Sequence, residues 1–503
     1  MAKRPLFMQK TTTLFFSFSF IFILLSACTF SRIGLHMMPA VSDYKLFPKD
    51  TIFAAASPSA SFVEAQNPNI LPPLAHWLPK DYRKGEENWA QFMKKSHSTA
   101  FLVLRNDSLL FEDYANGHEK YEPQVVFSIS KAITALLVGI AIGEGKISAE
   151  QPVSDFIPEF SDPERRGIKI FHLLNMVSGI DFKDERDFGK LSVLYYNNDQ
   201  DKYIRNFDAV EHRPGTHFAY KSLATQILSS CLETATGQSV GDYLSDKLWQ
   251  PMGMECPALL TVDSREAGNQ RAFGGFALCS RDLLRLGQLL LHKGNWQGQQ
   301  LVPKDFIEQI INRQEDGRAY WGYRNCFWRN GDLEKGIFQD RDFFASGYLG
   351  QFIYVNPDRN LVVIRQGKKE NFLWRYVFNR LARSLDGEST DLNDHCQNFS
   401  AQFEGIYAAE DGEEIQLIEQ KDKKGNSFWI WKGPKEKKQK LKQFDGLCIG
   451  KRSLKTKKRL IFNKLGNNIQ GFHLDNQDQV DLKYYQKKSS ISLKGRKALM
   501  AEF

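Results

Sequence analysis

Ser128 and Lys131 are the two side chains of this sequence whose types and spacing best fit nucleophilic chemistry. A serine hydroxyl is a weak nucleophile at neutral pH and needs a nearby base, and a lysine can be that base when its amine is neutral. Residues three positions apart on a helix project from the same face. The apolar run at 130–143 predicts a buried helix, and burial lowers the pKa of a lysine. We therefore expect Ser128 to be the nucleophile and Lys131 to be its proton partner.

The Ser-x-x-Lys spacing is short enough to arise by chance, and the chain contains it twice. The second copy, Ser42-Asp43-Tyr44-Lys45, has no apolar helix behind it, so we assign that copy to chance. Ser128 instead lies where a β-type segment meets the most apolar predicted helix. The N-terminus of this helix offers the Ser128 backbone N–H as a donor for an oxyanion, and its dipole favours developing negative charge.

A third group must carry the proton to the leaving atom. Tyr220 is a candidate, in the segment Pro214-Gly215-Thr216-His217-Phe218-Ala219-Tyr220-Lys221-Ser222, because a phenol beside an ammonium can act first as general base and then as general acid. The segment Tyr195-Tyr196-Asn197-Asn198 has a similar tyrosine-x-asparagine spacing. Local pattern alone therefore leaves the choice of tyrosine open.

Several separate blocks resemble the class C β-lactamase-like serine hydrolases in order and spacing. They are Phe127-Ser128-Ile129-Ser130-Lys131, Leu173 to Ile180, Pro214 to Tyr220, and Gly274-Gly275-Phe276 followed by Ser280 to Leu283. That group includes class C β-lactamases, D-alanyl-D-alanine carboxypeptidases, certain esterases and 6-aminohexanoate-oligomer hydrolases. The resemblance spans about residues 100–383. It implies an α/β (α+β) two-lobed β-lactamase/transpeptidase-like fold, with an antiparallel sheet flanked by helices, a helical lobe, and the site between them.

The resemblance also implies roles for further residues. It selects Tyr220 as the catalytic tyrosine and places Ser222 where the β-lactamases usually have asparagine. Ala345-Ser346-Gly347 matches the third family motif, so Ser346 and Gly347 join Ser222 as substrate-binding candidates, and the Tyr348 N–H is the second oxyanion donor. Ala345 stands where the family has a cation that helps hold a substrate carboxylate.

The Ala345 substitution favours a small ester or amide as substrate over a β-lactam. Two alternatives remain: a D-alanyl-D-alanine carboxypeptidase or weak β-lactamase, and a non-catalytic envelope lipoprotein on a hydrolase scaffold. The class A Glu-x-x-Leu-Asn pattern is absent from the sequence, so water activation would fall to Tyr220 and Lys131. We expect no cofactor.

The N-terminus has the pattern of an export signal. Basic residues precede an apolar run at 13–27, and Leu25-Ser26-Ala27-Cys28 resembles a bacterial lipobox. We expect residues 1–28 to be a lipoprotein signal and Cys28 to be the lipidated residue, which gives the protein a membrane anchor; a plain signal peptide is the alternative. Thr29 follows Cys28 directly, at the position where an aspartate would resemble an inner-membrane retention signal. We therefore expect the outer membrane, with the protein facing the periplasm.

Composition separates three further regions. Residues 29–79 are rich in Pro, Ala and Ser and predict a tether or loosely packed arm. Residues 80–386 would form the hydrolase domain, and short strand-like runs between lysine clusters at 398–503 predict a basic, β-rich C-terminal domain. That basic face fits either a solvated surface or attraction to anionic lipid or cell-wall polymers.

Charge and cysteine content limit the partners. The formal net charge is +8, but the chain has no recognisable nucleic-acid-binding motif, so we expect no nucleic-acid partner. The six cysteines after Cys28 are scattered, without Cys/His clusters at metal-ligand spacing, so we expect no metal site. Six cysteines allow fifteen complete disulfide pairings, and the sequence does not choose among them. We expect most of them to be buried thiols. The sequence also leaves the oligomeric state open.

Overall fold

The computed structural model describes residue 33 and residues 38–58, 62–78, 88–182, 184, 188–312, 322–329, 340–372 and 374–388, and the backbone of eight strands between 405 and 489. The predicted signal peptide and Cys28 lie outside these residues. Among the described residues, no helix has the length and apolar character needed to cross a bilayer.

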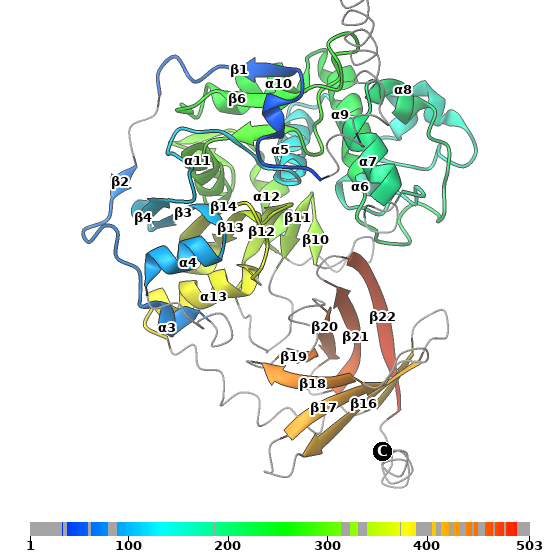
Figure 1. Ribbon diagram of the computed structural model, residues 1–503. Coiled ribbons are helices and arrows are strands. Elements are labelled where there is room, and N and C mark those ends of the chain that lie inside the picture. The colour runs from blue at the N-terminus through cyan, green and yellow to red at the C-terminus, as the bar shows by residue number, and fades with distance from the viewer. Residues whose placement is uncertain are drawn as a thin grey trace, which may run out of the picture.

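An eight-stranded sheet organises the larger part of the chain (Figure 1). Its strands follow the order β10 (Tyr323–Arg324), β11 (Phe327–Arg329), β12 (Phe343–Gly347), β13 (Gln351–Asn356), β14 (Leu361–Gly367), β3 (Ser98–Arg105), β4 (Ser108–Tyr114) and β2 (Val63–Glu64). All neighbours are antiparallel except β2 and β4, which run parallel.

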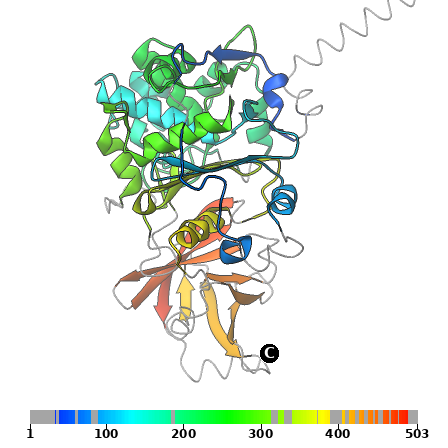
Figure 2. The same ribbon diagram turned by 90° about the vertical axis from the view of Figure 1, so that its left-hand side faces the viewer.

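Alternation along β3 divides the core into two layers. Ala100, Leu102 and Leu104 belong to the larger apolar cluster, whereas Phe101 and Val103 belong to a second one. The second cluster is covered by α3 (Leu74–Trp77), α4 (Trp89–Lys95) and α13 (Trp374–Leu385), and α11 (Ser280–Leu291) packs on the opposite face. Figure 2 shows the yellow α13 on one side of the sheet and the green helices on the other.

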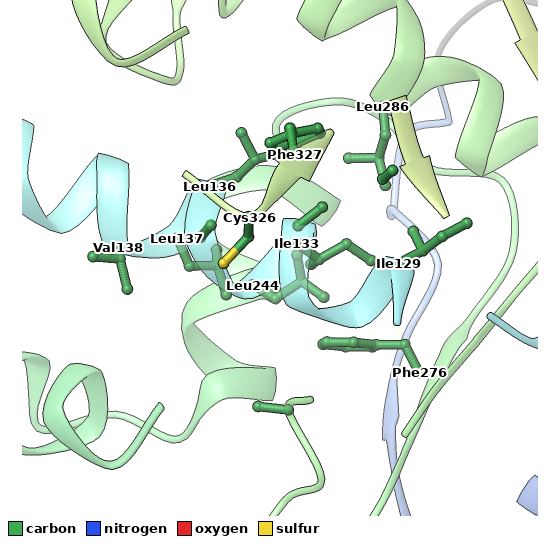
Figure 3. Packing of buried hydrophobic residues seen from close by; sticks show 14 of the residues in the cluster. Ile129, Ile133, Leu136, Leu137, Val138, Leu244, Phe276, Leu286, Cys326 and Phe327 are labelled. Atoms are coloured by element: carbon green, nitrogen blue, oxygen red, sulfur yellow. The ribbon is translucent and has the colours of Figure 1, made fainter. Parts of the chain in front are cut away.

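The helical lobe is built around the apolar helix that the sequence predicted. This helix is α5 (Ile129–Gly143), and it is buried along nearly its whole length. Figure 3 shows Ile133 and Leu137 of α5 among Cys326, Leu244 and Phe276. The lobe also contains α6 (Ile170–Leu174), α7 (Phe188–Tyr196), α8 (Gln200–Arg205), α9 (Ser222–Thr236) and α10 (Val240–Leu244). Because α9 packs on both α5 and α6, it fixes the segment that precedes it against the start of α5.

The remaining described elements of this region are short. They are α12 (Lys304–Ile311), the two-stranded sheet β8 (Asn295–Trp296) and β9 (Gln299–Gln300), and the helical turns η1 (Asp43–Lys45), η3 (Val153–Asp155), η4 (Pro158–Ser161), η5 (Ser245–Trp249) and η6 (Pro357–Arg359).

The expectation of a loosely packed arm at 29–79 is wrong for much of the part that the structure describes. Strand β1 (Lys49–Ile52) pairs with β6 (Ala258–Thr261) in a four-stranded sheet completed by β7 (Phe276–Leu278) and β5 (Gln124–Val125). Farther along, β2 joins the main sheet and α3 buries Trp77 in the second core cluster. Proline and alanine content indicated a linker, but pairing with strands some 200 residues away gives this segment its structure.

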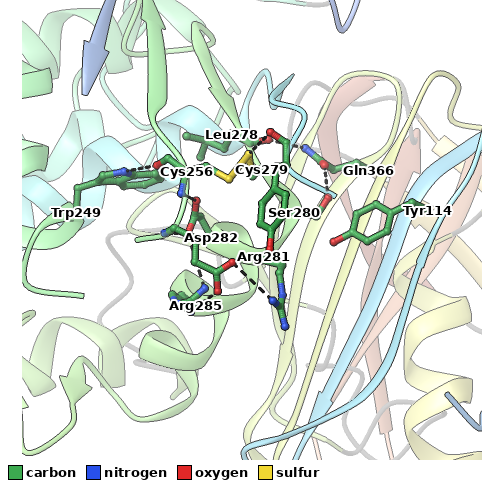
Figure 4. Close-up of a disulfide and its surroundings, with 12 residues drawn as sticks. Tyr114, Trp249, Cys256, Leu278, Cys279, Ser280, Arg281, Asp282, Arg285 and Gln366 are labelled. Atoms are coloured by element: carbon green, nitrogen blue, oxygen red, sulfur yellow. Dashed lines mark hydrogen bonds and ion pairs between the residues drawn. A yellow bond between two sulfur atoms is a disulfide. The ribbon is translucent and has the colours of Figure 1, made fainter. Parts of the chain in front are cut away.

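Among the cysteines that the structure describes, one pair is bridged. Cys256 and Cys279 form a disulfide with their Cα atoms 6.3 Å apart, while Cys231 and Cys326 are buried thiols. Figure 4 shows the bridge beside Asp282, whose carboxylate accepts hydrogen bonds from the backbone N–H groups of Glu255 and Cys256. The bridge therefore closes a loop that contains β6 and β7.

The C-terminal segment, where the sequence predicted a β-rich domain, forms a closed barrel of eight strands. The strands are β15 (Gly405–Ala408), β16 (Glu414–Lys421), β17 (Ser427–Lys432), β18 (Gln439–Phe444), β19 (Leu447–Gly450), β20 (Lys458–Leu465), β21 (Asn468–Asn476) and β22 (Gln479–Ser489). Closure between β15 and β22 leaves no free edge in this barrel.

Candidate active site

Ser128 is the N-cap residue of α5. It follows Phe127, whose φ of +47° lies in the left-handed region that side chains other than glycine rarely adopt. Phe127 is held there by burial and by an edge contact with the ring of Tyr348, 5.6 Å between centroids. This sharp turn places Ser128 on the lining of a cavity to which both lobes contribute.

Lys131 lies one helical turn farther on and is 1% exposed. Its Nζ donates to Ser128 Oγ at 2.8 Å and to the carbonyl oxygen of Phe273 at 3.0 Å. Burial lowers the pKa of Lys131 to about 8, although Asp184 and Cys326 act in the opposite direction. An appreciable fraction of the amine is therefore neutral near pH 7, as a base for Ser128 requires.

The ring of Tyr220 lies next to the Lys131 ammonium. The Nζ atom is 5.1 Å from the centroid of the Tyr220 ring. The ring stacks on Trp328 of β11 with centroids 5.6 Å apart, and it meets Tyr323 of β10 edge-on at 5.9 Å. The structure thus brings together Ser128, Lys131 and Tyr220, the three catalytic residues that the sequence predicted.

The competing tyrosine, Tyr195, has another partner. Its hydroxyl donates to the buried carboxylate of Asp43 at 3.0 Å. Asp43 belongs to the Ser42–Lys45 segment that we assigned to chance, and it serves there as a structural acceptor for Tyr195. The rings of Tyr195 and Tyr196 still line the cavity.

Strand β12 supplies the wall opposite α5. Ser346 and Gly347, the substrate-binding candidates, and Tyr348, the oxyanion-donor candidate, all line the cavity. A Cβ atom on Gly347 would lie 2.1 Å from the carbonyl oxygen of Val126, so only glycine allows the strand to approach the start of α5 this closely. Ala345 packs in the apolar core and pairs with Ile353 in the sheet.

Ser222, at the position of the family asparagine, binds a carboxylate that the sequence did not single out. Its backbone N–H and its hydroxyl donate to the two oxygens of Asp184, at 2.7 and 2.5 Å. Burial raises the pKa of Asp184, while Lys131, Ser222 and Lys221 oppose that rise. Asp184 stands in an acidic stretch without any local motif, so only the folded chain shows its position beside Ser222.

Lys221 does not supply the charge that Ala345 lacks. Its side chain is buried and its Nζ donates to the carbonyl oxygen of Ile180, and it is not among the residues that line the cavity.

The cavity between the lobes has a volume of about 530 Å³. Aromatic side chains dominate its lining: Phe127, Tyr195, Tyr196, Tyr220, Phe273, Trp328, Phe344, Tyr348, Phe352 and Trp374. Its charged residues are Lys131, Asp184, Glu370 and Arg375. Such a lining suits a substrate with apolar or aromatic parts.

One group within the described residues has metal-ligand proximity: Cys256, Cys279 and Asp282. The two sulfur atoms are bonded to each other and Asp282 accepts two backbone N–H groups, so these residues do not offer the free thiolates that a metal such as zinc takes.

Comparison with known proteins identifies the family. The sequence profile of the beta-lactamase family matches residues 86–377, more than half of the chain. The chain belongs to the beta-lactamase family. This family includes hydrolases that act on amides and esters, and the predicted fold class and family resemblance are both confirmed.

This beta-lactamase-family chain is similar in sequence to proteins of two different names. It is 25% identical over 296 residues to the 6-aminohexanoate-dimer hydrolase of Paenarthrobacter ureafaciens, a match that covers 55% of this chain and 74% of that protein. It is also 25% identical over 214 residues to the D-aminopeptidase of Brucella ovis, which covers 38% of this chain and 37% of the relative.

The fold is also found in a solved structure from Bacillus anthracis, assigned provisionally as a 6-aminohexanoate-dimer hydrolase. It superposes with a TM-score of 0.58 at 22% identity, over 69% of this chain and 94% of the other. This likeness concerns the fold alone.

Proposed function

We propose that this beta-lactamase-family protein hydrolyses a small amide or ester through an acyl-enzyme on Ser128. The observation that carries the proposal is the contact of 2.8 Å between Lys131 Nζ and Ser128 Oγ, with the buried amine beneath the ring of Tyr220. Such a triad has the geometry of a nucleophile, its base and a proton carrier.

The proposed first step forms a bond from Ser128 Oγ to the substrate carbonyl carbon, while the neutral Lys131 amine accepts the hydroxyl proton. The backbone N–H groups of Ser128 and Tyr348 would stabilise the resulting oxyanion. Tyr220 then delivers a proton to the leaving nitrogen or oxygen as the substrate bond breaks. The Lys131 ammonium then passes its proton to Tyr220, so the amine is neutral again and the phenol is restored. In the second step, neutral Lys131 accepts a proton from water, directly or through Tyr220, as the water oxygen attacks the acyl carbon. The bond between that carbon and Ser128 Oγ then breaks, Oγ takes the proton from Lys131, and the acid is released.

The substrate class rests on two further observations. The two named sequence relatives are called a 6-aminohexanoate-dimer hydrolase and a D-aminopeptidase, both names of amide-cleaving enzymes. The β12 strand offers Ala345 where the resemblance expects a cation, and Lys221 does not replace it. Both points favour a linear amide or ester over a β-lactam or a D-alanyl-D-alanine terminus.

A fluorophosphonate probe tests the mechanism. We expect it to label the wild-type protein at Ser128, and we expect Ser128→Ala to abolish labelling while the protein keeps its circular dichroism spectrum. Failure of the folded wild-type protein to react would refute the proposal and favour the non-catalytic scaffold. Turnover of p-nitrophenyl esters, a linear 6-aminohexanoate-type amide and nitrocefin then separates the substrate classes, and a persistent penicillin adduct would favour the carboxypeptidase alternative.

We also propose that Cys28 carries a lipid that anchors the protein in the outer membrane, facing the periplasm. The support is the Leu25-Ser26-Ala27-Cys28 pattern after an apolar run. Metabolic labelling with palmitate should mark the wild-type protein and not Cys28→Ser. Equal labelling of both would contradict the anchor.

A further inference from the structure

Ser222 does not present its hydroxyl to the cavity as a lone polar group. Its Oγ donates to Asp184 Oδ2 at 2.5 Å, and its backbone N–H donates to Asp184 Oδ1 at 2.7 Å. Both residues line the cavity that contains Ser128 and Lys131. Two donors from one residue fix both oxygens of the carboxylate, and hydrogen bonds to its charged form favour that form.

Charged groups are few around Lys131, so one charged neighbour can have a large effect on the pKa of its amine. Its Nζ contacts the Ser128 hydroxyl, the Phe273 carbonyl and the Tyr220 ring. Two further groups act on its charge, namely Asp184, which lines the same cavity, and the buried Cys326 thiol. Burial raises the pKa of the Cys326 thiol to about 12, so this thiol is neutral at physiological pH. Among these groups, Asp184 is the one carboxyl, and Lys131 and the two hydrogen bonds from Ser222 favour its ionised form against the effect of burial on its pKa.

The charges around Asp184 are consistent with a link to Lys131. Burial raises the pKa of this carboxyl, and the first of the opposing influences is Lys131, followed by the two hydrogen bonds from Ser222 and then by Lys221. The ammonium of Lys221 donates to the Ile180 carbonyl oxygen, so its hydrogen bond serves the backbone.

We propose that Asp184, held by Ser222, is a positioning residue that sets the proton balance of Lys131. The pair would take the place of the family asparagine, acting through charge where the asparagine would act through an amide. This inference rests on the proposed function of Ser128 and Lys131. It gives Ser222 a role in holding Asp184, and not the direct substrate contact that the sequence predicted.

The sign of the effect follows from electrostatics. A negative Asp184 stabilises the ammonium form of Lys131, so removing the charge lowers the pKa of Lys131 further. The neutral amine is the form that accepts the Ser128 proton. The rate at which fluorophosphonate reacts with Ser128 should therefore rise at lower pH in a variant without the charge.

The experiment compares this rate between pH 5 and pH 10 in four variants. We expect Asp184→Asn to move the acid limb of the profile down by about one pH unit, within the range for loss of a nearby opposite charge. Ser222→Ala should move it in the same direction by less, and Ser222→Thr, which keeps a hydroxyl, should restore the wild-type profile. The matched control is Asp181→Asn, because Asp181 lies in the same loop but is 43% exposed and pairs with Lys190.

A second readout needs no reaction. The ¹³Cε resonance of Lys131, assigned by its loss in Lys131→Met, reports the pKa of the amine directly, so it tests this inference even if the fluorophosphonate fails to label Ser128. An unmoved Lys131 resonance or acid limb in folded Asp184→Asn would overturn the inference. So would a variant with the wild-type pH profile but a KM raised only for substrates with an ammonium group, because Asp184 would then bind substrate. If Asp184→Asn does not fold, Ser222→Ala gives the same test.

Discussion

Lys131→Met should remove the reaction of Ser128 and at the same time stabilise the fold near neutral pH. Lys131 is 1% exposed, and burial lowers its pKa from 10.5 to about 8. Each unit of pKa difference between folded and unfolded protein corresponds to about 1.4 kcal/mol. The buried ammonium therefore lowers the free energy of unfolding below pH 8 by roughly 3 kcal/mol, relative to high pH.

The pH window follows from the direction of this pKa change. Below pH 8 both the folded and the unfolded protein carry the proton on Lys131, and the cost is constant. Between pH 8 and pH 10.5 the folded protein loses this proton while the unfolded protein keeps it, so wild-type stability gains with rising pH. A methionine does not titrate. The stability advantage of Lys131→Met over wild type should thus shrink by about 3 kcal/mol across this window.

Urea unfolding of both proteins at pH 7.5 and pH 10.5 measures the effect. Differences in packing between lysine and methionine are the same at both pH values and cancel in the comparison. Lys304→Met is the control, because the Lys304 side chain is 60% exposed, and its difference from wild type should not depend on pH in this way. A pH-independent difference for Lys131→Met would refute the lowered pKa, and with it the argument that Lys131 is a competent base near neutral pH.

Two further predictions concern residues around the site. Tyr195→Phe should keep fluorophosphonate labelling but lose about 1–3 kcal/mol of stability, because the buried Asp43 carboxylate loses a hydrogen-bond donor. Tyr220→Phe should keep its stability and slow labelling by about 100-fold or more. The reverse pattern would assign the catalytic role to Tyr195 and the structural role to Tyr220. Replacing Cys256 and Cys279 by serine should lower stability by about 3 kcal/mol, since the bridge spans 23 residues. A reductant should lower the urea midpoint of the wild type but not of the double variant, and equal midpoints would show that the bridge does not form.

The sequence predicts best what depends on short-range periodicity. The apolar run at 130–143 gives α5, and its helical spacing places Lys131 beside Ser128, as the structure shows. The tyrosine could not be chosen from local pattern. Its position depends on how α9 packs against α5, and only the family resemblance selected Tyr220 before the fold was known.

Contacts between segments far apart in the sequence cannot be predicted from local periodicity. Asp184 has no motif around it, and its partnership with Ser222 depends on where two loops meet. The disulfide between Cys256 and Cys279 was one of many possible pairings. Likewise, the composition of β1 resembles that of a linker, and its strand character comes from the exposed edge of β6, to which it pairs.

Pro39 lies on the wall of the cavity, so the ordered N-terminal segment reaches the reaction site. Pro39 follows Cys28 by only eleven residues, which can span at most about 40 Å when fully extended. A lipid on Cys28 would make this segment a short membrane tether. It would keep Pro39, and with it the cavity, within about 40 Å of the bilayer surface. The protein would then meet its substrates in a thin layer beside the membrane rather than throughout the compartment. Molecules attached to lipid or to the nearby cell wall are concentrated in that layer.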